Sequence, residues 1–458
     1  MNAWDKYLDN GLNDVMTFNE GYKSFLTKGK TERECVTITE QIAVDHGFKK
    51  LDEYIANNQP LKTGDKVYSI NKGRNIVLFV IGEKPLVEGL NILGAHIDSP
   101  RLDLKQKPLY EDKDLVLFDT HYYGGVKKYQ WVARPLALHG IVCKKDGSVV
   151  NVVIGEDPSD PVIGISDLLP HLAADQMQKP AHKVIEGEDL NALVGSIPSK
   201  DKDAKERVKQ AILDLLKEKY DIEEDDFISS EFEIVPAEDA RDYGLDRSMV
   251  MGYGHDDRVC AYTSLKAILD IDTPSRTACC ILVDKEEVGS NGSTGMHSSY
   301  FSNVVLEMLA LQGEGTELSL RRAMERSLML SSDVSAAYDS NYPSVNEMKN
   351  TAFFGNGICI NKYTGARGKS GCNDASPEFL AKIRAIFAED DIMFQTAELG
   401  RVDQGGGGTI AYVLANLNME VVDAGIAVQN MHAPSEVVSK VDVYESYRAY
   451  KTFLNKCK

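Results

Sequence analysis

Several common signatures of enzymes are missing from this 458-residue sequence. None of its eight cysteines forms a C-x-x-C pair, which argues against a zinc ribbon and against a dithiol redox site. There is no H-E-x-x-H, no G-x-S-x-G and no G-x-x-x-x-G-K-[ST]. These absences argue against zincin proteases, nucleophile-elbow hydrolases and P-loop nucleotidases.

Long apolar runs and excess basic charge are also missing. No stretch of about 20 apolar residues is present, and the first residues lack the apolar core of a signal peptide. The net charge is −19 and the pI about 5.0, whereas nucleic acids and anionic membranes attract basic surfaces. We therefore expect a cytoplasmic protein without nucleic-acid or membrane partners.

The order of apolar segments predicts an α/β fold. Short apolar runs at 75–82 and 90–97 predict buried strands, and helix-period spacing predicts a helix over 34–56. From about residue 249, strand-like and helix-like segments alternate, including a strand over 420–428 and a closing helix over 437–454. Such alternation is typical of a mixed sheet sandwiched by helices.

A β-rich stretch interrupts this pattern. Short strands at 115–118, 136–143 and 149–154, the last two joined by a hairpin turn, predict a separate module. We therefore expect a discontinuous catalytic domain over 1–98 and 249–458, with an inserted domain over 99–248.

Side chains that bind metals recur at the ends of the predicted strands and before a predicted helix. They are His96, Asp98, Asp256, Glu286, Glu287, Asp333 and His432. Each has an ordinary explanation alone: Asp256 would cap a helix, and the adjacent glutamates would form a solvated loop in so acidic a chain. Together they predict a ligand site, because α/β sheets bind ligands beyond the carboxyl ends of their strands.

The chemistry of this set points to a dinuclear metal centre. Imidazole with carboxylate suits zinc, and also manganese or cobalt. Five ligand groups with one shareable carboxylate suit two ions about 3.5–4 Å apart. A spare carboxylate could then act as general base, and Glu286 or Glu287 is the obvious candidate.

The ordered motifs resemble those of the M18 metallo-aminopeptidases, a family that includes aspartyl aminopeptidases. They are His96-Ile97-Asp98-Ser99-Pro100, Asp256-Asp257-Arg258, Asp284-Lys285-Glu286-Glu287-Val288-Gly289-Ser290, Ser331-Ser332-Asp333 and Met431-His432. The resemblance spans nearly the whole chain. The inserted segment also resembles the dimerisation domain of the family, through Tyr123-Gly124-Gly125, Trp131, Arg134, Leu136 and the segment 168–173.

The resemblance implies a role for each of these residues. It implies that His96, Asp256 and Asp333 bind one metal ion, and that Asp256, Glu287 and His432 bind the other. Glu286 would be the general base and Asp98 would orient His96. It further implies that His171 reaches the active site of a neighbouring subunit, and that dimers assemble into a homo-oligomeric dodecamer acting on peptide substrates.

Substrate preference stays open at this stage. Segments 362–373 and 403–409 depart from the animal aspartyl-aminopeptidase pattern. An acidic and a neutral N-terminal residue are therefore both compatible with the sequence. Two other functions would use the same fold: a dinuclear deacylase of N-acyl amino acids, and a non-catalytic assembly protein.

Overall fold

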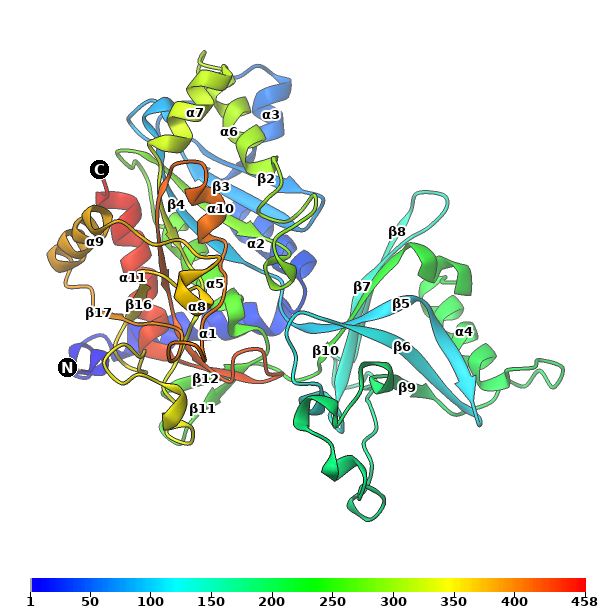
Figure 1. Cartoon of the computed structure of the whole chain (residues 1–458). Helices are drawn as coiled ribbons and strands as arrows, with labels where there is room; N and C mark the ends of the chain where they lie inside the picture. Colours follow the sequence, from blue (N-terminus) through cyan, green and yellow to red (C-terminus); the bar gives the residue numbers. More distant parts are fainter. Residues whose placement is uncertain (1) are drawn as a thin grey trace. The chain divides into compact units, whose positions relative to one another are not determined.

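The computed structural model describes residues 2–458, which form two compact units (Figure 1). Unit 1 comprises residues 2–98, 240–431 and 435–458, and unit 2 comprises residues 99–239 and 432–434. A single long insertion therefore separates the two main parts of unit 1 along the chain.

A nine-stranded mixed sheet forms the centre of unit 1. In spatial order its strands are β1 (Lys49–Lys50), β2 (Lys66–Asn71), β3 (Asn75–Val80), β13 (Thr277–Val283), β4 (Leu90–His96), β14 (Leu328–Ser331), β18 (Glu420–Gly425), β16 (Ile358–Asn361) and β17 (Phe394–Thr396). The four neighbours β13, β4, β14 and β18 are parallel. Their carboxyl ends therefore meet at one edge of the sheet.

Helices cover both faces of this sheet. One face packs against α1 (Leu12–Lys28), α2 (Glu32–Asp45), α5 (His255–Leu269), α9 (Pro377–Glu389) and α11 (Lys440–Lys456). The other packs against α3 (Leu51–Ala56), α6 (Tyr300–Leu311), α7 (Glu317–Glu325) and α10 (Ala411–Ala415). The predicted α/β class, a mixed sheet sandwiched by helices, is confirmed.

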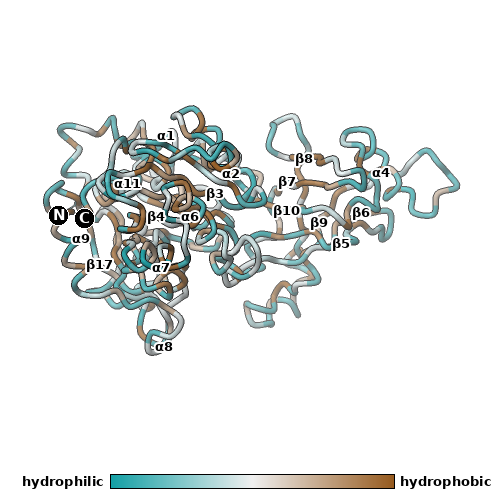
Figure 2. The backbone as a smooth tube through the Cα atoms, turned by 90° about the horizontal axis from the view of Figure 1, so that it is seen from above, coloured by the Kyte–Doolittle hydropathy of each residue, from teal (hydrophilic) through white to brown (hydrophobic). Residues whose placement is uncertain are grey.

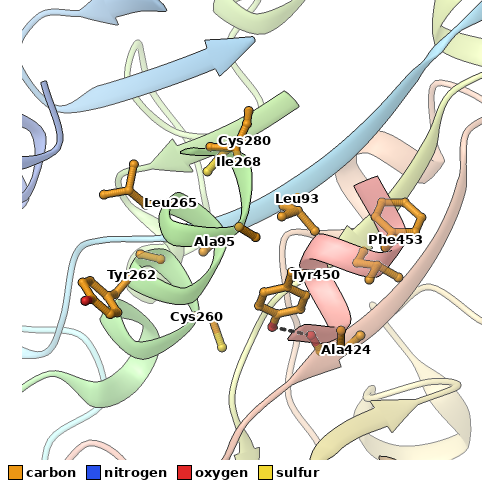
Figure 3. Packing of buried hydrophobic residues seen from close by; sticks show 14 of the residues in the cluster. Leu93, Ala95, Cys260, Tyr262, Leu265, Ile268, Cys280, Ala424, Tyr450 and Phe453 are labelled. Carbon is orange, nitrogen blue, oxygen red and sulfur yellow. Dashed lines mark hydrogen bonds between the residues drawn. The ribbon is translucent and has the colours of Figure 1, made fainter. Parts of the chain in front are cut away.

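Strand alternation explains why the central strands are apolar throughout. Successive side chains point to opposite faces of a sheet, so Leu93 faces α5 and α11 while Ile92 faces the other helix layer. Figure 3 shows Leu93 and Ala95 of β4 beside the side chains of α5 and α11. There the hydroxyl of Tyr450 donates a hydrogen bond of 2.7 Å to the carbonyl of Ala424. This packing holds α5 against the strand that ends at His96.

A smaller five-stranded sheet completes unit 1. Its order is β11 (Arg241–Tyr243), β12 (Met249–Gly252), β20 (Glu436–Ser439), β19 (Ala427–Gln429) and β15 (Ser335–Ala336). β12 runs antiparallel to β20 and leads directly into α5. The short helix α8 (Ala366–Lys369) also lies in this unit.

Unit 2 is built on a six-stranded antiparallel sheet. Its order is β8 (Val149–Ile154), β7 (Leu136–Cys143), β10 (Ser230–Pro236), β5 (Arg101–Asp112), β6 (Leu115–Tyr123) and β9 (Ala192–Gly195). The amphipathic helix α4 (Arg207–Tyr220) packs near β5, β6 and β9. In the hydropathy colouring of Figure 2, brown hydrophobic segments of this unit lie along its strands and teal segments along its loops.

Three predicted elements differ from the structure. The helix expected over 34–56 is two helices, α2 and α3, separated by Gly47 in a left-handed conformation. The strand expected over 420–428 divides into β18 and β19, which belong to different sheets. The closing helix begins at Lys440 and not at Val437, because residues 436–439 pair with β12 as strand β20.

No helix within residues 2–458 combines the length and the apolar character that crossing a membrane requires.

Candidate active site

The candidate site lies at the carboxyl edge of the parallel strands of unit 1. β4 ends at His96, β13 is followed by Glu286 and Glu287, and β14 is followed by Asp333. The register pairs Val283 with His96, and the backbone amide of Ile97 donates to the carbonyl of Val283 at 2.8 Å. The ends of β4 and β13 are thus fixed side by side.

His96 is buried, with an exposed fraction of 1%. Its Nδ1 lies 3.0 Å from the backbone carbonyl oxygen of Asp98, which can only accept, so Nδ1 carries the proton. Nε2 faces the carboxylates, 3.1 Å from Oδ1 of Asp256 and 3.8 Å from Oε2 of Glu286. Two ligands of one tetrahedral zinc ion stand about 3.4 Å apart, so His96 and Asp256 are spaced as two ligands of one ion would be.

Asp256 lies at the start of α5, where its backbone is not helical. Its amide donates a hydrogen bond of 3.0 Å to Oε2 of Glu436, and its side chain points to His96. The next residue, Asp257, is fully buried, and its Oδ2 accepts the backbone amide of His96 at 3.3 Å. The helix-cap explanation considered for Asp256 does not apply, because its carboxylate contacts the end of another strand.

The carboxylate of Asp98 holds the main chain of the two adjacent glutamates in place. Its Oδ1 accepts the backbone amide of Glu286 at 3.1 Å, and its Oδ2 accepts that of Glu287 at 3.2 Å. Oδ1 also stands 3.4 Å from Nδ1 of His96. One fully buried carboxylate therefore fixes both the imidazole and the backbone from which the two glutamates extend.

Three groups of potential ligand atoms overlap here, each with its atoms within 4.8 Å of one another. They are His96 with Asp256 and Glu287, His96 with Glu286 and Asp333, and Asp256 with Asp257 and Asp333. Both glutamates of the pair therefore reach the cluster. Distance alone does not divide the roles of ligand and base between them.

The electrostatics of the cluster fit divalent cations. Burial, together with the charges of Asp257 and Glu286, holds the pKa of the Asp333 carboxyl well above its usual value. Burial also raises the pKa of Asp257 well above its usual value, and the neighbouring charge of Asp256 adds to that rise. Carboxylates that are this costly to ionise together are those that a bound cation would stabilise. Imidazole and carboxylate oxygen are also the donors that zinc, manganese and cobalt accept.

Two predicted site residues belong to unit 2. His432 lies in its short segment 432–434, and Nδ1 of His432 donates to the carbonyl of Gly125 at 2.9 Å. Nε2 is consequently the ring nitrogen that carries a lone pair. His171 lies in a 3₁₀ turn, Pro170–Leu172, and is exposed.

Two buried acids of this region, Asp257 and Glu436, were not among the predicted site residues. Asp257 accepts the backbone amide of His96 and its side chain also lies in the ligand cluster, whereas Glu436 accepts the backbone amide of Asp256. The signal in the sequence was weak. Glu436 opens the apolar run Glu436-Val437-Val438, where an acid is unexpected.

Comparison with known proteins identifies a family. The family described as aminopeptidase I zinc metalloprotease (M18) matches residues 25–454. A probable M18 family aminopeptidase 1 from Clostridium acetobutylicum is 58% identical over 454 residues, which cover 99% of this chain and 98% of that protein.

Solved structures agree with the sequence comparison. The crystal structure of an M18 family aminopeptidase from Thermotoga maritima is 40% identical and superimposes with a TM-score of 0.95, covering 100% of this chain and 99% of the other. The mApe1 dodecamer of Saccharomyces cerevisiae is 19% identical, with a TM-score of 0.77 over 96% of this chain and 97% of its own, and shares the fold.

Proposed function

The chain belongs to the M18 family of zinc aminopeptidases, and from that premise we propose that it removes single N-terminal residues from peptides with two divalent ions and a glutamate base. The observation that carries the proposal is the overlap of three ligand groups around His96 and Asp256 at the edge of the sheet. An intact set of ligand-type residues speaks against a non-catalytic assembly protein.

In this proposal His96, Asp256 and Asp333 hold one ion, and Asp256, Glu287 and His432 hold the other. The overlap of the groups supports Asp256 as the shared ligand, because it lies within reach of His96, Glu287 and Asp333. Zinc is the expected metal for the family, and manganese or cobalt could occupy one position. When bound, the ions would polarise the scissile carbonyl and lower the pKa of a water molecule.

Glu286 is proposed as the general base. Its side chain is 17% exposed, so it can meet a substrate, while the hydrogen bond from its amide to Asp98 fixes its backbone. Glu286 would take a proton from the attacking water and return it to the leaving amine. Asp98 would keep His96 in the tautomer whose Nε2 faces the cluster.

We infer that the two lysines of segment 362–373 do not by themselves select acidic N-terminal residues. The resemblance places the segment 362–373 near the substrate, and its two lysines are already paired. Lys362 and Lys369 both contact Asp374, the second at 3.0 Å. Lys369 also lies 3.8 Å from the centre of the Tyr363 ring. Cations neutralised in this way attract an acidic substrate side chain weakly.

We also propose that the enzyme assembles into homo-oligomers, as the resemblance implies. Leu169 and Leu172 flank His171 with exposed fractions of 49% and 69%, and Met177 nearby is 76% exposed. Exposed apolar residues grouped along one short segment are typical of a surface that another subunit covers. This supports a role for His171 at a neighbouring active site.

The test is hydrolysis of aminoacyl-anilides and short peptides after chelation and readdition of zinc, manganese or cobalt. We expect metal-dependent release of the free N-terminal residue, and the rates for acidic and neutral N-terminal residues measure the preference. Release of an acyl acid from N-acyl amino acids, without peptide hydrolysis, would identify a deacylase instead. Inactivity with all three metals would contradict the proposed function.

A further inference from the structure

Glu436 is a buried acid at the first position of β20, with an exposed fraction of 1%. It lies four residues after His432 and is paired in register with Gly252 of β12. Its Oε2 accepts the backbone amide of Asp256 at 3.0 Å. The carboxylate thus spans the turn between the end of β12 and the start of α5.

The hydrogen bond from Asp256 to Glu436 fixes a peptide group that the regular hydrogen bonds of α5 do not fix. Asp256 has φ −80° and ψ 106°, outside the helical region, so its backbone is not held by the regular hydrogen bonds of α5. The position of this peptide group therefore sets the direction of the Asp256 side chain. Oδ1 of Asp256 lies 3.1 Å from Nε2 of His96, and the Asp256 carboxylate is also within reach of Glu287 and Asp333.

The other half of the cluster is held in the same way. The carboxylate of Asp98 accepts the backbone amides of Glu286 and Glu287, which fixes the main chain of both glutamates. Both anchors are buried acids, and both accept main-chain amides. Asp98 follows β4 of the large sheet, whereas Glu436 belongs to the small sheet.

We propose that Glu436 is a positioning residue for Asp256, and that it sets the geometry of the shared metal ligand without touching substrate. The inference rests on the proposed dinuclear site. Removing the acceptor would leave the amide of Asp256 buried without its partner and free the turn to move. Outer groups of this kind are worth about 10- to 100-fold in metal affinity or activity.

A merely structural role predicts a different outcome, and unit 1 offers a matched control. Asp442 is also a fully buried acid that accepts two backbone amides, from Gly355 at 2.8 Å and from Gly357 at 2.7 Å. No group of potential metal ligands within residues 2–458 includes it. Substitution of Asp442 therefore tests the loss of a buried acceptor without a connection to the metal cluster.

The experiment compares Glu436→Met with Asp442→Leu, each a replacement of similar size without an acceptor. Metal affinity is measured by competition with a chromophoric chelator, beside the melting temperature of the metal-free protein and kcat and KM. We expect Glu436→Met to bind metal about 10- to 100-fold more weakly, with a lower kcat and little change in KM. Glu436→Gln, which keeps an acceptor oxygen, should restore most of the affinity. Asp442→Leu should lower the melting temperature but leave metal affinity within about twofold of wild type.

Wild-type metal affinity in Glu436→Met, or an equal loss of affinity in Asp442→Leu, would overturn the proposal. If Glu436→Met does not fold, Glu436→Asp decides, because a carboxylate shorter by one methylene cannot reach the same amide. It should bind metal more weakly than Glu436→Gln, and the reverse order would contradict the inference. A wild-type protein that binds metal but hydrolyses no peptide would instead refute the proposed function alone.

Discussion

The sheet edge of unit 1 and the segment around His171 in unit 2 differ in which kind of side chain they bury and which they expose. At the sheet edge of unit 1, charged groups such as His96, Asp98 and Asp257 are buried and held by hydrogen bonds with main-chain atoms. In unit 2, apolar residues such as Leu172 and Met177 lie exposed along the segment that carries His171. Polar groups removed from water require partners or a cation, and apolar groups left in water favour a covering surface. The difference fits the roles proposed for the two regions, catalysis at the sheet edge and assembly at the segment that carries His171.

Among the variants that test this comparison, Asp256→Ala should have the largest effect. Because Asp256 is the proposed shared ligand, the variant should lose both ions and all measurable activity. Elemental analysis after dialysis measures the metal content, and Asp272→Ala, at an aspartate whose side chain is 96% exposed, serves as control. A full complement of metal in Asp256→Ala would exclude the shared-ligand assignment.

Glu286→Gln should separate catalysis from metal binding. Glutamine keeps the shape of the side chain but cannot take a proton, so kcat should fall at least about 100-fold while both ions stay bound. The matched variant Glu287→Gln should instead weaken the binding of one ion. Equal activity of Glu286→Gln and wild type, with both ions present, would show that Glu286 is not the base.

Leu172→Glu tests the assembly side of the comparison. A charge placed on the exposed apolar segment of unit 2 should disfavour its burial against another copy, so the molecular mass from light scattering should fall. Metal affinity should stay unchanged. Leu318→Glu is the control, since Leu318 of α7 is similarly exposed, at 58% against 69% for Leu172, but lies in unit 1. An unchanged mass in Leu172→Glu would place the subunit interface elsewhere.

Asp423→Asn should have the smallest effect on catalysis, because Asp423 is buried but belongs to no group of potential metal ligands within residues 2–458. Asp423 of β18 accepts a hydrogen bond from Thr409, and burial raises its pKa from 3.8 to about 7. Between these values the folded state holds a proton that the unfolded state releases. The free energy of unfolding contributed by this group therefore falls as pH rises through that window, by about 1.4 kcal/mol per pH unit.

The asparagine variant, which does not titrate, should lack this part of the pH dependence. Chemical denaturation at several pH values between 4 and 7 measures the pH dependence of the free energy of unfolding. The kinetic constants of Asp423→Asn at neutral pH should match those of wild type. An unaltered pH profile of stability in Asp423→Asn would contradict the assignment.

Regular elements with strong local patterns could be predicted from the sequence. β7 and β8 begin and end where apolar spacing placed them. β20 could not be predicted, because its strand form depends on pairing with β12, more than a hundred residues earlier in the chain. Val437 and Val438 suit a strand, but they also continued the periodic pattern of the following helix.

The residues of the candidate site also differ in whether the sequence predicts them. Ligand-type residues at the ends of strands could be recognised by their chemical type and their place after apolar runs. The structural contributions of Asp257 and Glu436 could not, because they depend on which main-chain amide lies beside a carboxylate in three dimensions. Local sequence does not record such distant partners.

The strand order of the large sheet has a consequence for synthesis on the ribosome. β13 lies between β3 and β4, so residues from both sides of the long insertion alternate within one sheet. A nascent chain that has exposed only β3 and β4 cannot place the strand between them. Such non-local pairing is slow to form. Because Asp256, Asp333 and the glutamate pair all follow the insertion along the chain, the candidate site can form only after the insertion has been synthesised.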